Sequence, residues 1–158
     1  MGPLAFFNNI PGAQISLIHD TLSPTPSGNV TKFLNDHFAG EFYQPVYTME
    51  NAPPLDVLVV PGGFTGTGIA LGNPAWQNYI AKVYPTLQYL FTVCTGSGIA
   101  ARAGVLSGRN ATTNKSAFRW IETLGGNVTW IAVARWVVDG NIWTSSGKSH
   151  QELGTAMK

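Results

Sequence analysis

The segment 87-LQYLFTVCTGSGIAARAGVL-106 decides which fold the sequence predicts. Its first part is rich in β-branched and aromatic residues, which is typical of a buried strand. In the part that follows, Ile99, Ala103 and Leu106 recur at the spacing of one helix face. The single cysteine of the chain, Cys94, stands where the predicted strand meets the predicted helix.

A second apolar run, 55-LDVLVVPGG-63, predicts another strand. Val57–Val60 is uninterrupted and apolar, as expected for a parallel strand that is covered on both faces. The helix predicted to follow has Asn73 as its cap and Pro74 in its first turn. Strands that alternate with helices predict an α/β fold with a mostly parallel sheet.

Further elements flank these two strands. We expect a short helix over 3–9, a strand over 13–20, an edge strand over 41–49, a helix over 115–126 and a β-hairpin over 134–146. Pro45 limits the 41–49 strand to a sheet edge, because proline has no amide for the ladder. Asp139-Gly140 is the predicted turn of the hairpin.

Composition limits the classes of protein that fit. The 158 residues suit one domain, residues 1–158, and charged residues make up 11% against a usual fraction of about a quarter. A net charge of +1 without any basic run gives no reason to expect a nucleic-acid or membrane partner. One cysteine allows no internal disulfide, and the first residues lack the pattern of a signal peptide, so we expect a cytoplasmic protein.

Two predicted strand ends carry residues that suit a binding or catalytic site. Gly62-Gly63 follows one strand and Cys94-Thr95-Gly96 follows the other, and sites in open α/β sheets form at such ends. A nucleophile on a tight strand-to-helix turn is exposed, and the helix N-terminus favours the thiolate. The amides of Gly63 and Thr95 are then candidate donors to a developing anion.

A simpler interpretation stands beside this one. A lone cysteine is among the most often buried residues and usually packs as a small apolar group. The Gly62-Gly63 pair also fits a plain chain reversal. We therefore keep two interpretations of Cys94, a presented nucleophile and a buried thiol.

His19 is the candidate base, because it lies near the end of a predicted strand and so near the same sheet edge. It is also compatible with an ordinary surface histidine, as are His37 and His150. No spacing typical of a metal site occurs, and the glycine run after the 55–63 strand lacks the lysine of a phosphate loop, so we expect no metal and no cofactor.

Three segments, DVLVVPGGFTGTG, FTVCTGSGIAARAGVLSGRNATTNK and ARWVVDGNIWTSSG, occur in this order and together resemble the DJ-1/PfpI superfamily, the class I glutamine amidotransferase-like fold. The isonitrile-hydratase-like branch is the most similar. The resemblance implies a flavodoxin-like three-layer sandwich, a nucleophilic Cys94, and a substrate and oxyanion region around Gly62, Gly63 and Gly96. It also implies a homodimer.

The resemblance assigns two further positions. Thr95 stands where PfpI-type proteases have histidine, and isonitrile-hydratase-like members have threonine there, near substrate or water. Asn114 stands where relatives present a polar side chain near the pocket.

The implied function is cysteine-dependent hydration of an isonitrile, a small-molecule substrate, to an N-substituted formamide. The alternatives are a non-catalytic, redox-sensing or chaperone-like member, and glyoxalase-like chemistry on small aldehydes. Relatives begin with a strand and an acidic residue that pairs with the cysteine, and they continue past the hairpin into an apolar helix. Neither pattern is found here, so we expect a sequence trimmed at both ends and an impaired proton shuttle.

Overall fold

The computed structural model describes residues 6–26 and 42–147. They belong to two compact units, Met1–Pro53 and Pro54–Lys158, and each unit is described by itself. The single domain expected over 1–158 stays a prediction.

The first unit contains four two-residue strands. They are β1 (Ile18–His19), β2 (Thr25–Pro26), β3 (Phe42–Tyr43) and β4 (Tyr47–Thr48). β1 pairs with β4 in parallel and β2 pairs with β3 antiparallel. The strand predicted over 13–20 is therefore much too long, and the 41–49 strand is split around Pro45, which has no amide for the ladder. Of the helix predicted over 3–9, Phe6 and Phe7 are helical and residues 1–5 lie outside the described range.

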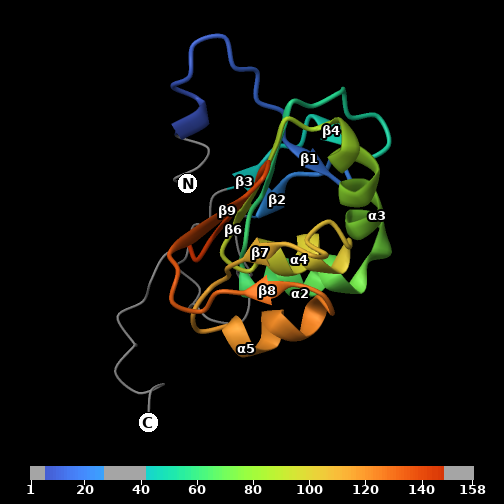
Figure 1. The fold of residues 1–158 in the computed structure, drawn as a ribbon. Coiled ribbons are helices and arrows are strands. Elements are labelled where there is room, and N and C mark those ends of the chain that lie inside the picture. Colours follow the sequence, from blue (N-terminus) through green and yellow to red (C-terminus); the bar gives the residue numbers. More distant parts are fainter. Residues whose placement is uncertain (1–5, 27–41, 148–158) are drawn as a thin grey trace. The chain divides into compact units, whose positions relative to one another are not determined.

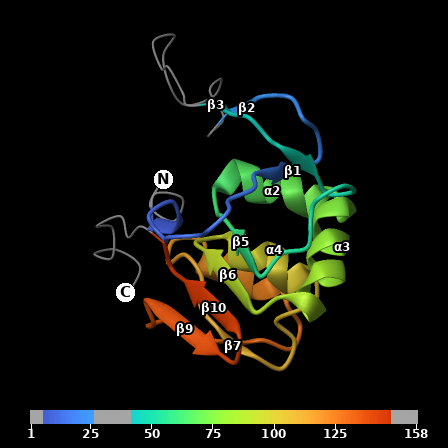
Figure 2. The ribbon, with the colours of Figure 1, turned by 90° about the horizontal axis from the view of Figure 1, so that it is seen from above.

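The second unit is built on a four-stranded sheet. Its order is β5 (Val57–Val60), β6 (Tyr89–Val93), β10 (Ile142–Ser145) and β9 (Trp136–Asp139). The first three strands are parallel and β9 is antiparallel, so the mostly parallel sheet and the antiparallel hairpin are confirmed. Figure 1 shows these strands with the helices of the unit beside them, and Figure 2 shows them from above.

Helices and short elements connect the strands of the second unit. They are α2 (Phe64–Gly72), α3 (Pro74–Val83), η1 (Tyr84–Thr86), α4 (Gly96–Arg102), β7 (Asn110–Ala111), α5 (Phe118–Ile121), η2 (Glu122–Leu124) and β8 (Thr129–Trp130). The predicted cap of α3 is confirmed, because Asn73 Oδ1 accepts the Ala75 amide at 3.1 Å. α2 was not expected, since glycine disfavours helix interiors. Burial of Thr67 and Ala70 accompanies the helix and indicates that packing outweighs propensity.

The two faces of the sheet differ sharply in exposure. On one face the side chains are buried, among them Val60, Leu90, Thr92, Ile142 and Thr144. Helix α4 contacts β5 and β6. The opposite face carries Tyr89, Trp136, Val138 and Trp143, which are 44%, 68%, 46% and 40% exposed. Of the side chains of β5, Val60 is buried and Val57, Leu58 and Val59 are partly exposed, so this strand is covered less completely than expected.

The aromatic residues of the open face form a ladder across two strands. The ring centroids of Tyr89 and Phe91 are 6.2 Å apart, and those of Phe91 and Trp143 are 5.5 Å apart. Tyr89 and Phe91 are neighbours on one face of β6, and the Phe91–Trp143 pair is the cross-strand contact, which stabilises β6 against β10. We call Tyr89, Phe91, Trp136, Val138 and Trp143 the aromatic face.

The turn of the hairpin differs from the prediction by one residue. Asp139 pairs with Ile142, so Gly140 and Asn141 are the two residues between the strands. Gly140 has φ +61°, a conformation that glycine adopts without strain. Asp139 instead ends β9, where its carboxylate accepts hydrogen bonds from Arg109 Nη1, the Asn110 amide and Asn110 Nδ2 at 3.0, 2.8 and 3.0 Å.

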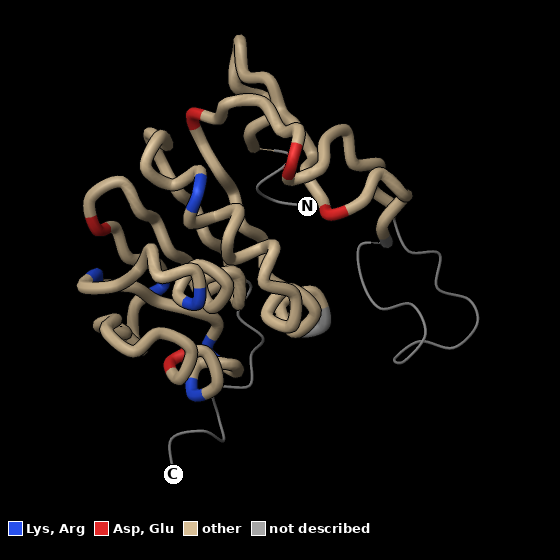
Figure 3. Tube along the Cα trace, turned by 90° about the vertical axis from the view of Figure 1, so that its right-hand side faces the viewer, with Lys and Arg blue, Asp and Glu red and all other residues tan. Residues whose placement is uncertain are grey.

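Charged side chains of the second unit are dispersed over its elements (Figure 3). Its described basic residues are Lys82, Arg102, Arg109, Lys115, Arg119 and Arg135. Arg109 pairs with Asp139, and the Lys115 ammonium donates to the carbonyl of Ala134 and to Thr112 Oγ1. In the part of the chain that the structure describes, no helix has the length and apolarity to cross a bilayer.

The contacts of Asp139 predict a pH-dependent contribution to stability. The Asn110 amide, and after it Arg109, hold the pKa of Asp139 below its ordinary value. The stabilisation is therefore present above the ordinary carboxyl pKa of about 3.9 and is lost as the pH falls through the lowered value. We expect Asp139→Asn to lower the melting temperature at pH 7 and to lose this part of the acid dependence. Glu122→Gln, at an exposed carboxylate without these contacts, is the control, and equal effects of both variants would contradict the assignment.

Candidate functional site

Cys94 lies in a strained turn between β6 and α4. Its φ is +59°, and it is the one non-glycine residue with positive φ in the described part of the chain. This conformation costs about 1–3 kcal/mol for an L-residue, so surrounding contacts must hold it. We call Val93–Thr95 the elbow. The Cys94 residue as a whole is partly exposed, and the nucleophilic role of its thiol stays a prediction.

Hydrogen bonds hold both backbone groups of Cys94. Its amide donates to the carbonyl of Ser145 on β10 at 2.9 Å. Its carbonyl accepts the hydroxyls of Ser97 at 3.1 Å and Thr113 at 3.0 Å. A net contribution of about 1 kcal/mol for each bond is of the same size as the backbone strain. The three bonds together therefore suffice to keep the elbow in place.

Glycines give the elbow the space that it occupies. A Cβ added at Gly62 would lie 2.6 Å from Cys94 Cβ and 2.7 Å from the Thr95 amide. One added at Gly147, which has φ +68°, would lie 2.7 Å from Cys94 Cβ. Gly96 is pressed against the carbonyls of Val60 and Pro61. Close packing of backbone thus accounts for Gly62 and Gly96, two of the glycines that the sequence assigned to a substrate region.

Thr95 connects the two predicted strand ends. Its side chain is fully buried, and its Oγ1 accepts the Gly63 amide at 2.9 Å and lies 2.8 Å from Thr67 Oγ1. The Gly63 amide, one of the two candidate oxyanion donors, is therefore directed at the threonine hydroxyl. An anion bound there would have to compete with this bond.

The Asn114 side chain stabilises the turn that precedes α5. Its Oδ1 accepts the Ser116 amide, the Ser116 hydroxyl and the Ala117 amide at 3.1, 2.6 and 3.2 Å. Its Nδ2 donates to the Ser146 carbonyl at 3.4 Å. The side chain thus organises the turn before α5, and its proposed role toward a substrate stays a prediction.

His19 belongs to the first unit and Cys94 to the second. His19 lies at the end of β1, with Nδ1 2.5 Å from Asp20 Oδ1. That His19 shares a sheet edge with Cys94 stays a prediction. His37 and His150 lie outside the described residues.

Two carboxylates of the second unit, Asp56 and Asp139, lie at the other end of the sheet from the elbow. Asp56 precedes β5, and Asp139 pairs across the hairpin with Ile142, so both lie at the amino end of the parallel strands. Cys94 follows the carboxyl end of β6. Within residues 6–26 and 42–147 the structure has no hydrogen bond to Cys94 Sγ and no group of three or more metal-ligating side chains.

Sequence reasoning missed the buried hydroxyls beneath the elbow. Thr67, Ser97 and Thr113 hold Thr95 or Cys94, and each is at most 1% exposed. The sole sequence signal for Thr113 is the small polar run Ala111–Asn114, which resembles many loops.

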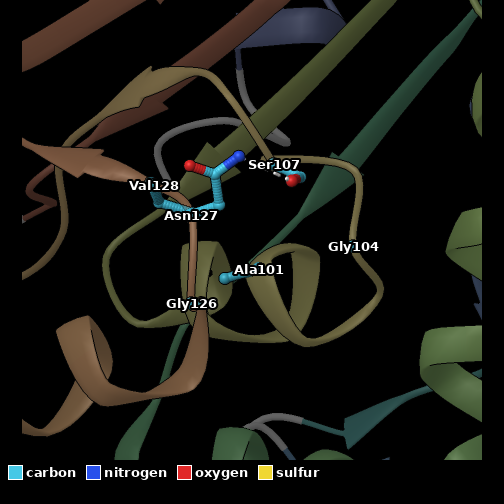
Figure 4. Close-up of a pocket in the computed structure, with 7 residues that line it drawn as sticks. Ala101, Gly104, Ser107, Gly126, Asn127 and Val128 are labelled. Atoms are coloured by element: carbon cyan, nitrogen blue, oxygen red, sulfur yellow. Dashed lines mark hydrogen bonds between the residues drawn. The ribbon is translucent and has the colours of Figure 1, made fainter.

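A shallow pocket of about 260 Å³ lies at the other end of α4 from the elbow (Figure 4). It is lined by Ala101, Gly104, Ser107, Gly125, Gly126, Asn127 and Val128. None of these side chains titrates, and the Asn127 side chain bonds Ser107. The pocket therefore supplies no group for acid–base or nucleophilic chemistry.

The close approach of Gly62 to the elbow predicts a stability contrast between two glycines. Gly62→Ala forces the backbone apart and should destabilise the protein by about 1–3 kcal/mol. Gly66→Ala places its Cβ in open space in α2 and should stabilise by about 0.5–1 kcal/mol. Chemical denaturation of both variants measures the difference, and a neutral Gly62→Ala would contradict the packing described.

A family model, a curated relative and a solved structure all relate this chain to similar proteins. Residues 11–157 match the family model described as the DJ-1/PfpI family. Isonitrile hydratase of Pseudomonas putida is 32% identical over 146 residues, which are 92% of this chain and 58% of the relative. The crystal structure of a ThiJ/PfpI family protein from Pseudomonas syringae superposes with a TM-score of 0.74 at 29% identity, covering 92% of this chain and 55% of that one.

A more distant structure supports the fold alone. The DJ-1 superfamily protein Atu0886 from Agrobacterium tumefaciens has a TM-score of 0.69 at 17% identity, over 91% of this chain and 73% of that one. The predicted α/β flavodoxin-like fold is thereby confirmed. The chain spans little more than half the length of the Pseudomonas putida and Pseudomonas syringae proteins.

Proposed function

The chain belongs to the DJ-1/PfpI family, and from this premise we propose that it hydrates isonitriles to N-substituted formamides through Cys94. The observation that carries the proposal is the elbow, a cysteine held in a left-handed turn at the carboxyl end of a parallel strand. The 32% identity to isonitrile hydratase supports the choice of substrate class.

The reaction requires water as its one co-substrate, so no cofactor is invoked. The Cys94 thiolate attacks the terminal carbon of R–N≡C, and that carbon takes up a proton, which gives a thioimidate, R–N=CH–S–Cys. Water then adds to this carbon, the C–S bond breaks, and the nitrogen gains a proton. The product is R–NH–CHO, and the thiolate is restored.

Proton delivery is the step that two described carboxylates of the second unit are poorly placed to support. Asp56 and Asp139 lie at the far end of the sheet, and Asp139 is already bonded to Arg109 and Asn110. The role of His19 as the base stays a prediction. General acid–base catalysis contributes about 10²–10⁴-fold, so a poorly placed donor would leave a slow enzyme.

The contacts of Thr95 support a role in holding the loop after β5 against the elbow. Its hydroxyl accepts the Gly63 amide and neighbours Thr67 Oγ1, so it binds the loop after β5 to the elbow. Because this hydroxyl is fully buried, it supports the elbow and the Gly63 loop in the structure, and its contact with substrate stays a prediction.

Replacement of the nucleophile is the direct test of the proposal. We expect Cys94→Ser to reduce formamide production from an alkyl isonitrile to the uncatalysed rate, because a serine hydroxyl without a base is a far weaker nucleophile. Product formation followed by ¹H NMR measures the formyl proton. Thr92→Val, a buried change at a hydroxyl without a hydrogen-bond partner among the described residues, is the control and should retain activity.

Two results would count against hydration. A folded wild-type protein that alkylates at Cys94 and yet forms no formamide would favour the non-enzymatic alternative. Lactate formation from methylglyoxal, together with failure on isonitriles, would favour glyoxalase-like chemistry.

A second test separates the side-chain roles at Thr95. Thr95→Val leaves the Gly63 amide without its acceptor and should lower kcat/KM by about 10–10²-fold, whereas Thr95→Ser keeps the hydroxyl and most of the activity. Equal rates for Thr95→Val and wild type would show that this hydroxyl has no part in the reaction. The homodimer and the cytoplasmic location remain predictions.

A further inference from the structure

The Cys94 carbonyl accepts two hydroxyl groups that differ in origin. Ser97 is three residues away, in the first turn of α4, and moves with the elbow. Thr113 is 19 residues away, just after β7. A carbonyl oxygen has two lone pairs, so the two bonds satisfy it completely. Among the described residues, the Thr113 bond is the one that joins this carbonyl to a distant part of the chain.

The residues on both sides of Thr113 are themselves anchored. The Thr112 amide donates to Thr144 Oγ1 at 2.8 Å, and the Thr112 hydroxyl donates to the Ile131 carbonyl at 2.9 Å. Asn114 Oδ1 accepts three hydrogen bonds in the following turn. Thr113 is 0% exposed. The Thr113 hydroxyl therefore has a fixed position, and the Cys94 carbonyl must point toward it to accept its hydrogen bond.

Two separate elements thus hold the two ends of one residue. The Cys94 amide is bonded to Ser145 on β10, and its carbonyl to Thr113. The directions of these two groups determine the two backbone dihedrals between them. We infer that Thr113 is a positioning residue, which keeps Cys94 in the left-handed conformation and so directs its sulfur. Its effect on turnover rests on the proposed function, whereas its effect on the Cys94 backbone does not.

The experiment compares Thr113→Val with the matched control Thr92→Val. Both positions are at most 1% exposed and both variants lose one hydroxyl and retain shape, but the Thr92 hydroxyl has no hydrogen-bond partner among the described residues. Thr113→Val leaves the Cys94 carbonyl bonded to Ser97, so the variant should fold. Because the chain has one cysteine, selective ¹³C labelling of cysteine gives signals from Cys94 alone.

We expect the Cys94 Cα and Cβ shifts to leave their left-handed values in Thr113→Val and to stay close to the wild-type values in Thr92→Val. Alkylation of Cys94 at pH 7 should slow by about tenfold in Thr113→Val, the equivalent of one hydrogen bond, and Thr113→Ser should restore both readouts. General loosening of the fold would instead speed alkylation, in both valine variants alike.

Unchanged Cys94 shifts in a folded Thr113→Val protein would overturn the inference. Should that variant not fold, Thr113→Ala makes the same comparison without the γ-carbons. If wild-type protein proves inactive on isonitriles, the proposed function fails, and the labelled shifts still decide whether Thr113 positions Cys94. If wild-type protein hydrates isonitriles, Thr113→Val should have a lower kcat than wild type, together with its changed Cys94 shifts, and a KM that differs little.

Discussion

The backbone conformation of Cys94 is the constraint on which the rest of the second unit depends. A left-handed cysteine is unfavourable by itself, and it persists because neighbouring elements leave no room for an alternative. Gly62 and Gly147 allow backbone to approach Cys94, while β10 and the segment after β7 hold its amide and carbonyl. Three separate parts of the sequence, around Gly62, around Thr113 and over 145–147, therefore converge on one residue.

The same convergence explains why so many small polar side chains are buried in this region. Thr67, Thr95, Ser97, Thr112 and Thr113 are each at most 1% exposed, and each hydroxyl has a partner in the structure. Most of their partners are backbone groups or other hydroxyls, which fix chain direction without buried charge, and Thr112 also accepts from the Lys115 ammonium. The result is a rigid support for Cys94, a residue that is partly exposed.

Much of this fold is predictable from local patterns, and the exceptions have physical reasons. β5, β6, α3 and the hairpin follow from apolar runs, a capping Asn73 and turn residues. α2 does not, because its glycines oppose the helix and tertiary packing decides. At the site, Cys94 is visible as the single cysteine at a strand-to-helix junction. Thr113 is not visible, since its role arises from a contact between residues 19 apart in sequence.

The aromatic face has a consequence for how the molecule behaves in concentrated solution. With a net charge of +1, molecules repel one another very little near neutral pH, so short-range attraction between exposed indole and phenol rings is hardly opposed. The aromatic face is thus one surface through which molecules of this chain are expected to attract one another at high concentration.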